Sequence, residues 1–260
     1  MNFRKQSLLF LKQIVYESKS YRRNPAAAFF TLVFPLLFLF MLRIFGNDSV
    51  EIDGGTVSRA TKYIPMITAF SVIGSSYTGI AMTLTLNRDI GVLKRYKGTP
   101  LPLMIFLLSK ISHNTIVSFA LAIIIALIAF TIFDVGLPTN SIVAFLLTMI
   151  LGAATFTTLG IAFTSLIPNS DAAAPMVNAS IIPLMFISDV FIPMDSAPNW
   201  LNWIAQIFPV RPFSLSLQEA YSPFSSGITE NPENYVILLA WLIVGLVTSC
   251  LLYTSDAADE

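Results

Sequence analysis

The stretch NRDIGVLKRYKGTPLP, from Asn87 to Pro102, is a short charged segment between two long apolar runs. This stretch and the residues just beyond it carry five of the chain's 15 Lys and Arg: Arg88, Lys94, Arg95, Lys97 and Lys110. Positively charged connections tend to stay on the cytoplasmic side of a membrane. The stretch therefore separates apolar segments and indicates which of their ends face inward.

The remaining composition is that of a membrane protein. Of the 260 residues, 55% are hydrophobic and 12% are charged, with a mean hydropathy of +0.73. Soluble domains contain about 25% charged residues, so this chain has few charges to cover a soluble surface. A helix needs roughly 20 apolar residues to cross a bilayer, and such segments lie at about 26–45, 63–86, 111–133, 141–167, 172–193 and 235–251. The sequence predicts an all-α integral membrane protein, with a six-transmembrane-helix bundle over residues 25–249.

The first 24 residues are predicted to form an amphipathic interfacial helix instead of a span. Lys5, Lys12 and Lys19 recur every seven residues, and the opposite side is expected to hold Leu8, Leu11, Ile14, Val15 and Ser18. Such a helix can lie in the headgroup layer with its lysines in water. The alternative is a helix that packs on a soluble partner. Asn24 and Pro25 end the helix, because the residue before a proline avoids helical geometry.

A second short segment, residues 195–212, lies between the fifth and sixth predicted spans. Trp200 and Trp203 share one face of this predicted helix with further apolar residues, and prolines flank it. The segment is too short to cross a membrane, and tryptophan prefers the boundary between membrane and water. We expect an interfacial or re-entrant helix at the outer surface.

The charges of the connecting segments predict the orientation. The first 24 residues and residues 87–110 hold 11 of the 15 Lys and Arg, and their acids are Glu17 and Asp89. The other connections and span ends hold most of the remaining acids. Because Lys and Arg favour the cytoplasmic side, we expect a multi-pass protein of the cytoplasmic (plasma) membrane with its N-terminus inside.

The sequence lacks the groupings of side chains that catalysis or metal binding would need. His113 is the single histidine and is expected to be a boundary residue; no His/Cys/acid cluster and no G-x-x-x-x-G-K-[ST] phosphate loop is present. The spans are nearly free of carboxylates, which an ion-driven carrier would normally place at mid-depth. Asp189 lies near the outer end of span five. An ion-coupled transporter or channel, and a membrane enzyme or assembly factor, are therefore the disfavoured alternatives.

The opening stretch also predicts a short cytoplasmic helix over residues 88–96. Gly98 would end this helix, and Ile90 and Leu93 would share an apolar side between charged flanks. The helix could simply join two membrane spans with positive anchors. It could also be a docking element for a soluble partner.

Four features along the chain occur in a recognisable order. An amphipathic helix closes at Arg22-Arg23-Asn24-Pro25, and a span containing Pro35 follows. After span two comes RDIGVLKRYKGTPLP, and after span four a run from Asn178 through Pro183 and SDVFIP to Pro198-Asn-Trp-Leu. In this order they resemble the membrane subunit of ATP-binding-cassette exporters of the type-2 permease family. The likeness covers nearly the whole chain up to its last residues.

The resemblance implies a subunit that pairs with a second copy or a paralogue in the lipid bilayer and binds cytoplasmic ATPase subunits. ATP and Mg would be held by the ATPase, with no cofactor on this chain and no nucleic acid as a partner. The segment after span two would be the coupling helix, with Arg88, Asp89, Gly91, Leu93, Lys94 and Arg95 as its contact residues. The N-terminal helix, with Lys5, Lys12, Lys19, Arg23, Asn24 and Pro25, would brace the same contact.

The resemblance also implies a translocation path between the two copies, lined by spans one and five and gated outside by the Trp-containing helix. The residues concerned are Asn178, Pro183, Ser188, Asp189, Trp200 and Trp203. The family usually has Gly where this chain has Asp189, so either the outer gate is locally altered or the acid contributes to substrate selection. The cargo could be a drug, a lipid or a lipid-linked glycan.

The last eleven residues, Cys250 to Glu260, resemble the translation of a sequencing-library adaptor. We therefore treat residues 250–260 as a non-native tail and expect the natural chain to be cut off within its last helix. Without Asp256, Asp259 and Glu260 the acids fall from 15 to 12, and the formal charge becomes +3 against 15 Lys and Arg.

Overall fold

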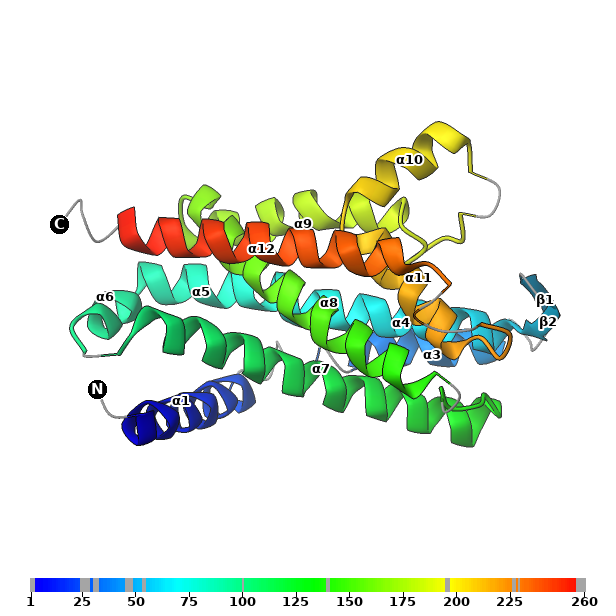
Figure 1. Ribbon diagram of the computed structural model, residues 1–260, viewed down its shortest axis with the longest axis horizontal. Coiled ribbons are helices and arrows are strands. Elements are labelled where there is room, and N and C mark those ends of the chain that lie inside the picture. Colours follow the sequence, from blue (N-terminus) through cyan, green and yellow to red (C-terminus); the bar gives the residue numbers. More distant parts are fainter. Residues whose placement is uncertain are drawn as a thin grey trace.

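The computed structural model describes residues 3–23, 29, 33–44, 49–52, 55–99, 101–138, 141–194, 197–225, 228 and 230–255. Most of its helices run along the long axis of the molecule (Figure 1). Four helical segments in this part of the chain are long and apolar enough to cross a membrane: Arg59–Asp89, Met104–Phe133, Ile142–Leu166 and Pro232–Leu251. The architecture is that of an all-α membrane protein, as the composition predicts.

The described elements are mainly helices, with one pair of short strands. In chain order they are α1 (Phe3–Arg22), α3 (Phe34–Ile44), β1 (Ser49–Ile52), β2 (Gly55–Ser58), α4 (Arg59–Ile73), a π-helix (Gly74–Gly79), α5 (Ile80–Asp89), α6 (Val92–Lys97), α7 (Leu103–Phe133), α8 (Ile142–Phe163), a 3-10 turn (Thr164–Leu166), α9 (Ser170–Phe186), α10 (Asn199–Ile207), α11 (Val210–Tyr221) and α12 (Pro232–Ser255). The strands form one antiparallel hairpin in which Val50 pairs with Val57.

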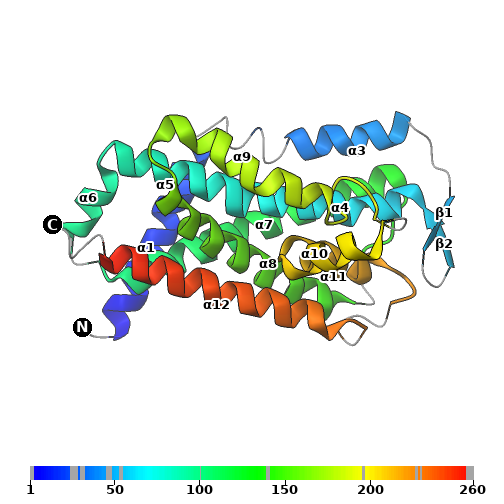
Figure 2. The same ribbon diagram turned by 90° about the horizontal axis from the view of Figure 1, so that it is seen from above.

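The bundle has two chemically different ends (Figures 1 and 2). Helices α1 and α6, the α8–α9 turn and the end of α12 lie at the end that we call the basic end, which carries Lys12, Lys19, Arg22, Arg23, Arg88, Lys94 and Arg95. The β-hairpin, the α7–α8 connection and α10 lie at the opposite end. The segments that the charge pattern groups together therefore lie at one end of the fold.

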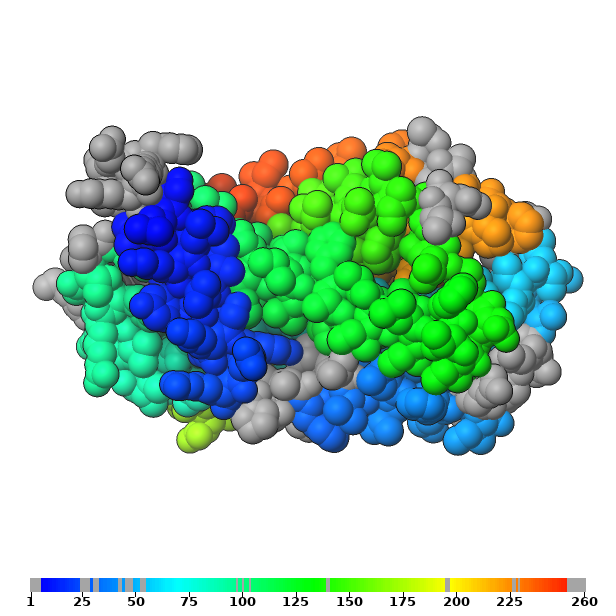
Figure 3. Space-filling view, turned by 90° about the horizontal axis from the view of Figure 1, so that it is seen from below, coloured from blue at the N-terminus to red at the C-terminus, as the bar shows by residue number. Residues whose placement is uncertain are grey.

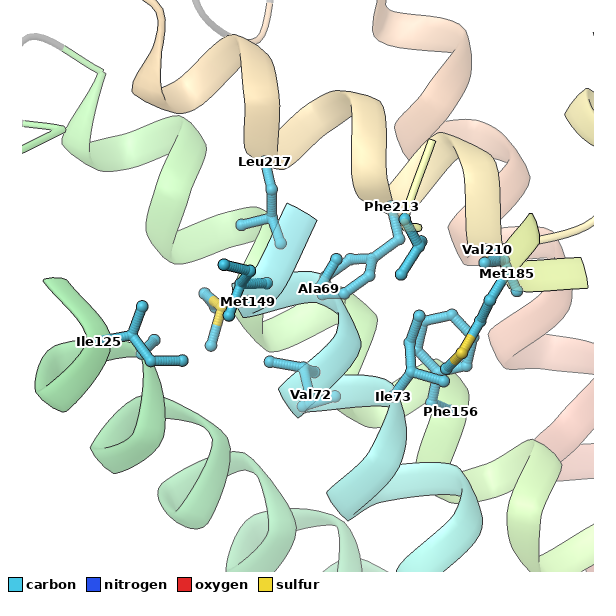
Figure 4. Close-up of a cluster of buried hydrophobic side chains, with 14 of the residues drawn as sticks. Ala69, Val72, Ile73, Ile125, Met149, Phe156, Met185, Val210, Phe213 and Leu217 are labelled. Atoms are coloured by element: carbon cyan, nitrogen blue, oxygen red, sulfur yellow. The ribbon is translucent and has the colours of Figure 1, made fainter. Parts of the chain in front are cut away.

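The core lies where α4, α8 and α11 meet (Figure 4). Ala69 and Val72 of α4, Phe156 of α8 and Phe213 of α11 are buried there. Phe156 and Phe213 meet edge on, with ring centroids 5.4 Å apart. A Cβ atom at Gly152 of α8 would lie 2.1 Å from the Phe213 ring, so a glycine is needed where this ring packs.

The middle of the segment 59–89 is the π-helix GSSYTG. A Cβ atom at Gly160 of α8 would lie 2.8 Å from the backbone oxygen of Tyr77. On another side, Ser76 Oγ lies 3.2 Å from Ser118 Oγ of α7. Small and hydroxylated residues thus allow α7 and α8 to approach the π-helix closely.

Helix α7 begins earlier than the predicted segment 111–133. It starts at Leu103 and includes Lys110, which the sequence assigned to the charged connection. The Lys110 side chain is 4% exposed and its ammonium nitrogen lies 2.9 Å from the Glu17 carboxylate of α1. Lysine is seldom buried without a partner, and here the partner comes from a distant part of the sequence.

The fifth and first predicted segments differ from the structure in length or lie partly outside it. Helix α9 ends at Phe186, seven residues before the end of the predicted segment 172–193, and the chain then turns through Asp189, whose φ is 55°. Of the predicted segment 26–45, the helix α3 covers 34–44; residues 26–28, 30–32 and 45 are outside the described residues.

The predicted outer helix with the two tryptophans is present as α10, but the segment 195–212 also contains the start of a second helix, α11, which is joined to α10 at Phe208 and Pro209. Pro209, one of the flanking prolines, lies at a turn, after which α11 runs into the core. The turn lies beside α12: Trp241 Nε1 donates to the backbone oxygen of Ile207 at 2.8 Å, and its ring stacks on Phe208. Helices α10 and α11 thus form a hairpin whose tip lies beside α12.

Candidate functional site

The short helix after α5 is present, but it begins at Val92 and not at Arg88. Gly91 causes the difference. Its φ of 74° lies in the left-handed region that favours glycine, so the chain turns sharply and α6 starts anew. The amide of Gly98 donates to the backbone oxygen of Lys94 at 3.2 Å and closes α6 as expected.

The predicted apolar ridge of this helix is divided between two faces. Leu93 packs inward on a buried cluster that includes Leu84 and Phe106, and Tyr96 lies against the Phe106 ring at 5.8 Å. Ile90 is 60% exposed. Leu93 therefore attaches α6 to the bundle, while Ile90 remains accessible together with the exposed side chains of Lys94 and Arg95.

Arg88 and Asp89 are the last residues of α5 and bind the α8–α9 turn. Arg88 donates from Nη1 to the backbone oxygen of Thr164 at 2.9 Å, and from Nη2 to the backbone oxygens of Ile167 and Pro168. Asp89 Oδ2 accepts the amide of Ser170, the first residue of α9. The two charges join the ends of three helices, α5, α8 and α9, next to α6.

Helix α1 is fixed to α7 by a polar cluster that the sequence reasoning missed. Lys110 Nζ lies 2.9 Å from both carboxylate oxygens of Glu17, and Gln13 Nε2 donates to Glu17 Oε1 at 3.1 Å. Ser18 Oγ lies 3.1 Å from Nδ1 of His113. A signal was available: Gln13, Glu17 and Ser18 share one face of α1, and Lys110 and His113 share one face of α7.

The predicted division of α1 into opposite lysine and apolar sides differs from the structure in part, because Ser18, assigned to the apolar side, contacts α7. Gln13 is buried, whereas Leu8, Leu11 and Val15 are each more than half exposed beside Lys12 and Lys19. The Lys5 side chain, Asn24 and Pro25 lie outside the described residues, and Arg23 is exposed.

Asp189 belongs to the packing of the opposite end. Its side chain accepts the amide of Met194 at 2.7 Å, and Oδ2 lies 3.3 Å from Nε of Arg211, an ion-pair distance at an angle unsuited to a hydrogen bond. Ser214 Oγ donates to its backbone oxygen at 2.7 Å. The φ of Asp189 lies in the left-handed region, which glycine adopts most readily and Asp can also adopt. The acid thus joins the turn after α9 to α11, and Ser188 is buried beside it.

The remaining predicted path residues lie on the outside of this chain. Asn178 and Pro183 are exposed on α9, and Trp200 and Trp203 are exposed on α10. They differ in this from Ser188 and Asp189, which are buried.

A groove of about 560 Å³ lies between α8, α9, α12 and the tip of the α10–α11 hairpin. Its lining is almost wholly apolar and includes Phe156, Leu184 and Trp241. Its polar lining residues are Ser165, Thr248 and a hydroxyl pair, Tyr77 and Ser180, whose oxygens lie 2.8 Å apart. Sequence reasoning did not find the groove, because four distant segments create it. Within the described residues, no group of three or more His, Cys, Asp or Glu could hold a metal ion.

The sequence that forms this arrangement matches a known protein family. The family model described as "ABC-2 type transporter" matches residues 10–220, which include the α6 segment, the α8–α9 turn and the α10–α11 hairpin. The chain belongs to the ABC-2 type transporter family. The resemblance inferred from the four ordered features is confirmed.

Relatives of this ABC-2 chain align with most of its length. "Putative transport permease YvfS" of Bacillus subtilis (strain 168) is 24% identical over 238 residues, which cover 92% of this chain and 94% of the relative. "Putative transport permease ycf38" of Porphyra purpurea is 25% identical over 237 residues, covering 89% and 79%. The protein of the same name from Pyropia yezoensis is 24% identical over 223 residues, covering 84% and 74%.

Proposed function

We propose that this ABC-2 chain is the permease subunit of an ATP-driven exporter in the cytoplasmic membrane, with the basic end inside. ATP and Mg would be bound by a separate ABC ATPase that docks on α6. The observation that carries the proposal is the attachment of α6: Leu93 holds it to the bundle, and its neighbours Arg88 and Asp89 hold the α8–α9 turn. A push on α6 would therefore reach α5, α8 and α9 together.

The exposed side chains of α6 suit contact with a soluble protein. Lys94 and Arg95 project from this short, closed helix and Ile90 from the turn before it, while a different side chain, Leu93, packs against the bundle. An apolar side chain flanked by cations is a common type of interface anchor. The chain's own sequence offers no phosphate loop, so the energy for transport would come through this contact.

The path would lie between two copies of the chain, identical or paralogous. Exposed Asn178, in the middle of α9, supports this. A polar side chain inside a membrane is better placed against another protein surface or a water-filled path than in hydrocarbon. The apolar groove beside α9 supports a cargo with a hydrophobic part, a drug, a lipid or a lipid-linked glycan. The α10–α11 hairpin would be the re-entrant element that closes the outer end.

The test uses the chain reconstituted in vesicles with the ATPase encoded in the neighbouring reading frame. The readout is the change in ATP hydrolysis when the permease is added. Arg95→Glu should abolish that change while the variant still inserts and folds. Glu233→Arg reverses an exposed charge at the opposite end and should leave it intact. An Arg95→Glu variant that couples like the wild type would refute the docking role of α6.

A further inference from the structure

The free face of α1 is apolar and accessible. Leu8, Leu11, Val15 and Tyr16 are each more than half exposed, and they lie on the side of α1 turned away from α7. Figure 3 shows α1 lying across α7 at the basic end, transverse to the long axis of the bundle. Four large apolar side chains on one short helix need a cover that is itself apolar.

The same face is purely cationic in its charges. Lys12 and Lys19 are exposed beside the apolar residues, and Arg22 and Arg23 follow at the end of the helix. The sequence of α1 contains a single acid, Glu17, and this carboxylate is turned to Lys110 of α7. The ion pair thus removes the only negative charge of α1 from its free face.

Helix α1 crosses α7 within the first few turns of α7. Its contacts, Lys110 and His113, lie seven and ten residues after the start of α7 at Leu103. At about 1.5 Å per residue these contacts are roughly 10–15 Å from the helix start. With the basic end inside, a transverse helix at this height would lie near the level of the headgroup layer.

We propose that the free face of α1 is a binding surface for anionic phospholipids of the inner leaflet. Leu8, Leu11 and Val15 would enter the boundary of headgroups and acyl chains, and Lys12 and Lys19 would extend to the phosphates. Each lysine near an anionic surface contributes about 1 kcal/mol, roughly fivefold in binding. The inference does not depend on the proposed export function.

The experiment uses the full chain with Cys250→Ser and Leu11→Cys, spin-labelled at position 11 and reconstituted in phosphatidylcholine vesicles with or without phosphatidylglycerol. Collision rates with oxygen and with a water-soluble nickel chelate report the depth of the label. We expect the label to be deeper with phosphatidylglycerol. Lys12→Gln with Lys19→Gln should remove most of that difference in depth, because the two lysines together contribute about 25-fold to binding of α1 at an anionic surface. High salt should also weaken immersion of the unmodified face.

Two controls separate the lipid from other occupants. Lys62→Gln, a charge change at the opposite end, should leave the depth at position 11 unchanged. A label at Ile116, exposed on α7, should report hydrocarbon in both compositions. A label at position 11 that is equally open to the nickel chelate in both vesicles would overturn the proposal. So would protection that appears only when a soluble ATPase is added.

Discussion

The ion pair between α1 and α7 gives the sharpest prediction. Lys110 is 4% exposed and its ammonium lies 2.9 Å from both Glu17 oxygens. Glu17→Gln keeps the shape of the side chain but leaves the lysine charge buried without its counter-charge. Removing one partner of a buried pair costs about 3–5 kcal/mol, because the remaining charge has no compensation. We expect that cost to appear as detachment of α1.

The cost converts into a measurable rate. At about 1.4 kcal/mol per tenfold, a loss of about 3 kcal/mol raises the population of detached α1 roughly a hundredfold. Hydrogen exchange of the α1 amides in reconstituted protein should accelerate by a similar factor, while exchange in α8 stays unchanged. Lys12→Gln, which changes an exposed charge on the same helix, should accelerate exchange by no more than the roughly fivefold that one lysine contributes at an anionic surface.

A double variant distinguishes the pair from other contacts of α1. Glu17→Leu with Lys110→Met replaces both charges by apolar groups of similar size, so it should restore much of the slow exchange. Exchange in Glu17→Gln as slow as in the wild type would refute the reasoning. A double variant as fast as Glu17→Gln would show that packing, and not the buried charge, holds α1.

Three further predictions concern the hairpin and the core. Gly152→Ala should lower the thermal midpoint, because the added methyl meets the Phe213 ring and overpacking costs about 1–3 kcal/mol. Trp241→Phe should loosen the hairpin tip by about 1 kcal/mol, seen as faster exchange in α10, because the bond to the Ile207 oxygen is lost. Burial raises the pKa of Glu219 from 4.5 to about 7, so the thermal midpoint should fall as the pH rises from about 4.5 to above 7.

The sign of the pH effect follows from the two states. Below about 4.5 the Glu219 carboxyl is neutral whether the chain is folded or unfolded, and above about 7 the fold must hold it charged. Glu219→Gln should make the thermal midpoint nearly independent of pH over this range, and an unchanged pH dependence would contradict the assignment.

Gly136→Ala, where the structure leaves open space, is the control for the core variant Gly152→Ala. Equal exchange in α10 with and without Trp241 would contradict the predicted role of that hydrogen bond.

The sequence predicts the elements whose cause is local. Long apolar runs indicate the helices α7, α8 and α12, and Gly98 marks the end of α6 because helices commonly close at glycine. The order of the motifs indicates the family, which the match over residues 10–220 confirms.

The features that the sequence leaves open depend on distant partners. Lys110 looks like a surface anchor until Glu17, 93 residues away, is placed beside it. Pro209 looks like an end because a proline interrupts helices, yet the chain continues as α11 once Phe213 can pack on Gly152. Asp189 looks like a candidate for substrate contact, and its partner Arg211 becomes known only when the hairpin folds back.

The central claim is that a separate ATPase acts on this chain through α6. Photo-crosslinking tests it most directly, with one reactive residue placed at Arg95 on α6 or at Trp203 on α10 in the assembled complex. We predict a crosslink to the ATPase from position 95 and none from position 203. A complex that co-purifies but crosslinks from position 203, or from neither position, would contradict the account.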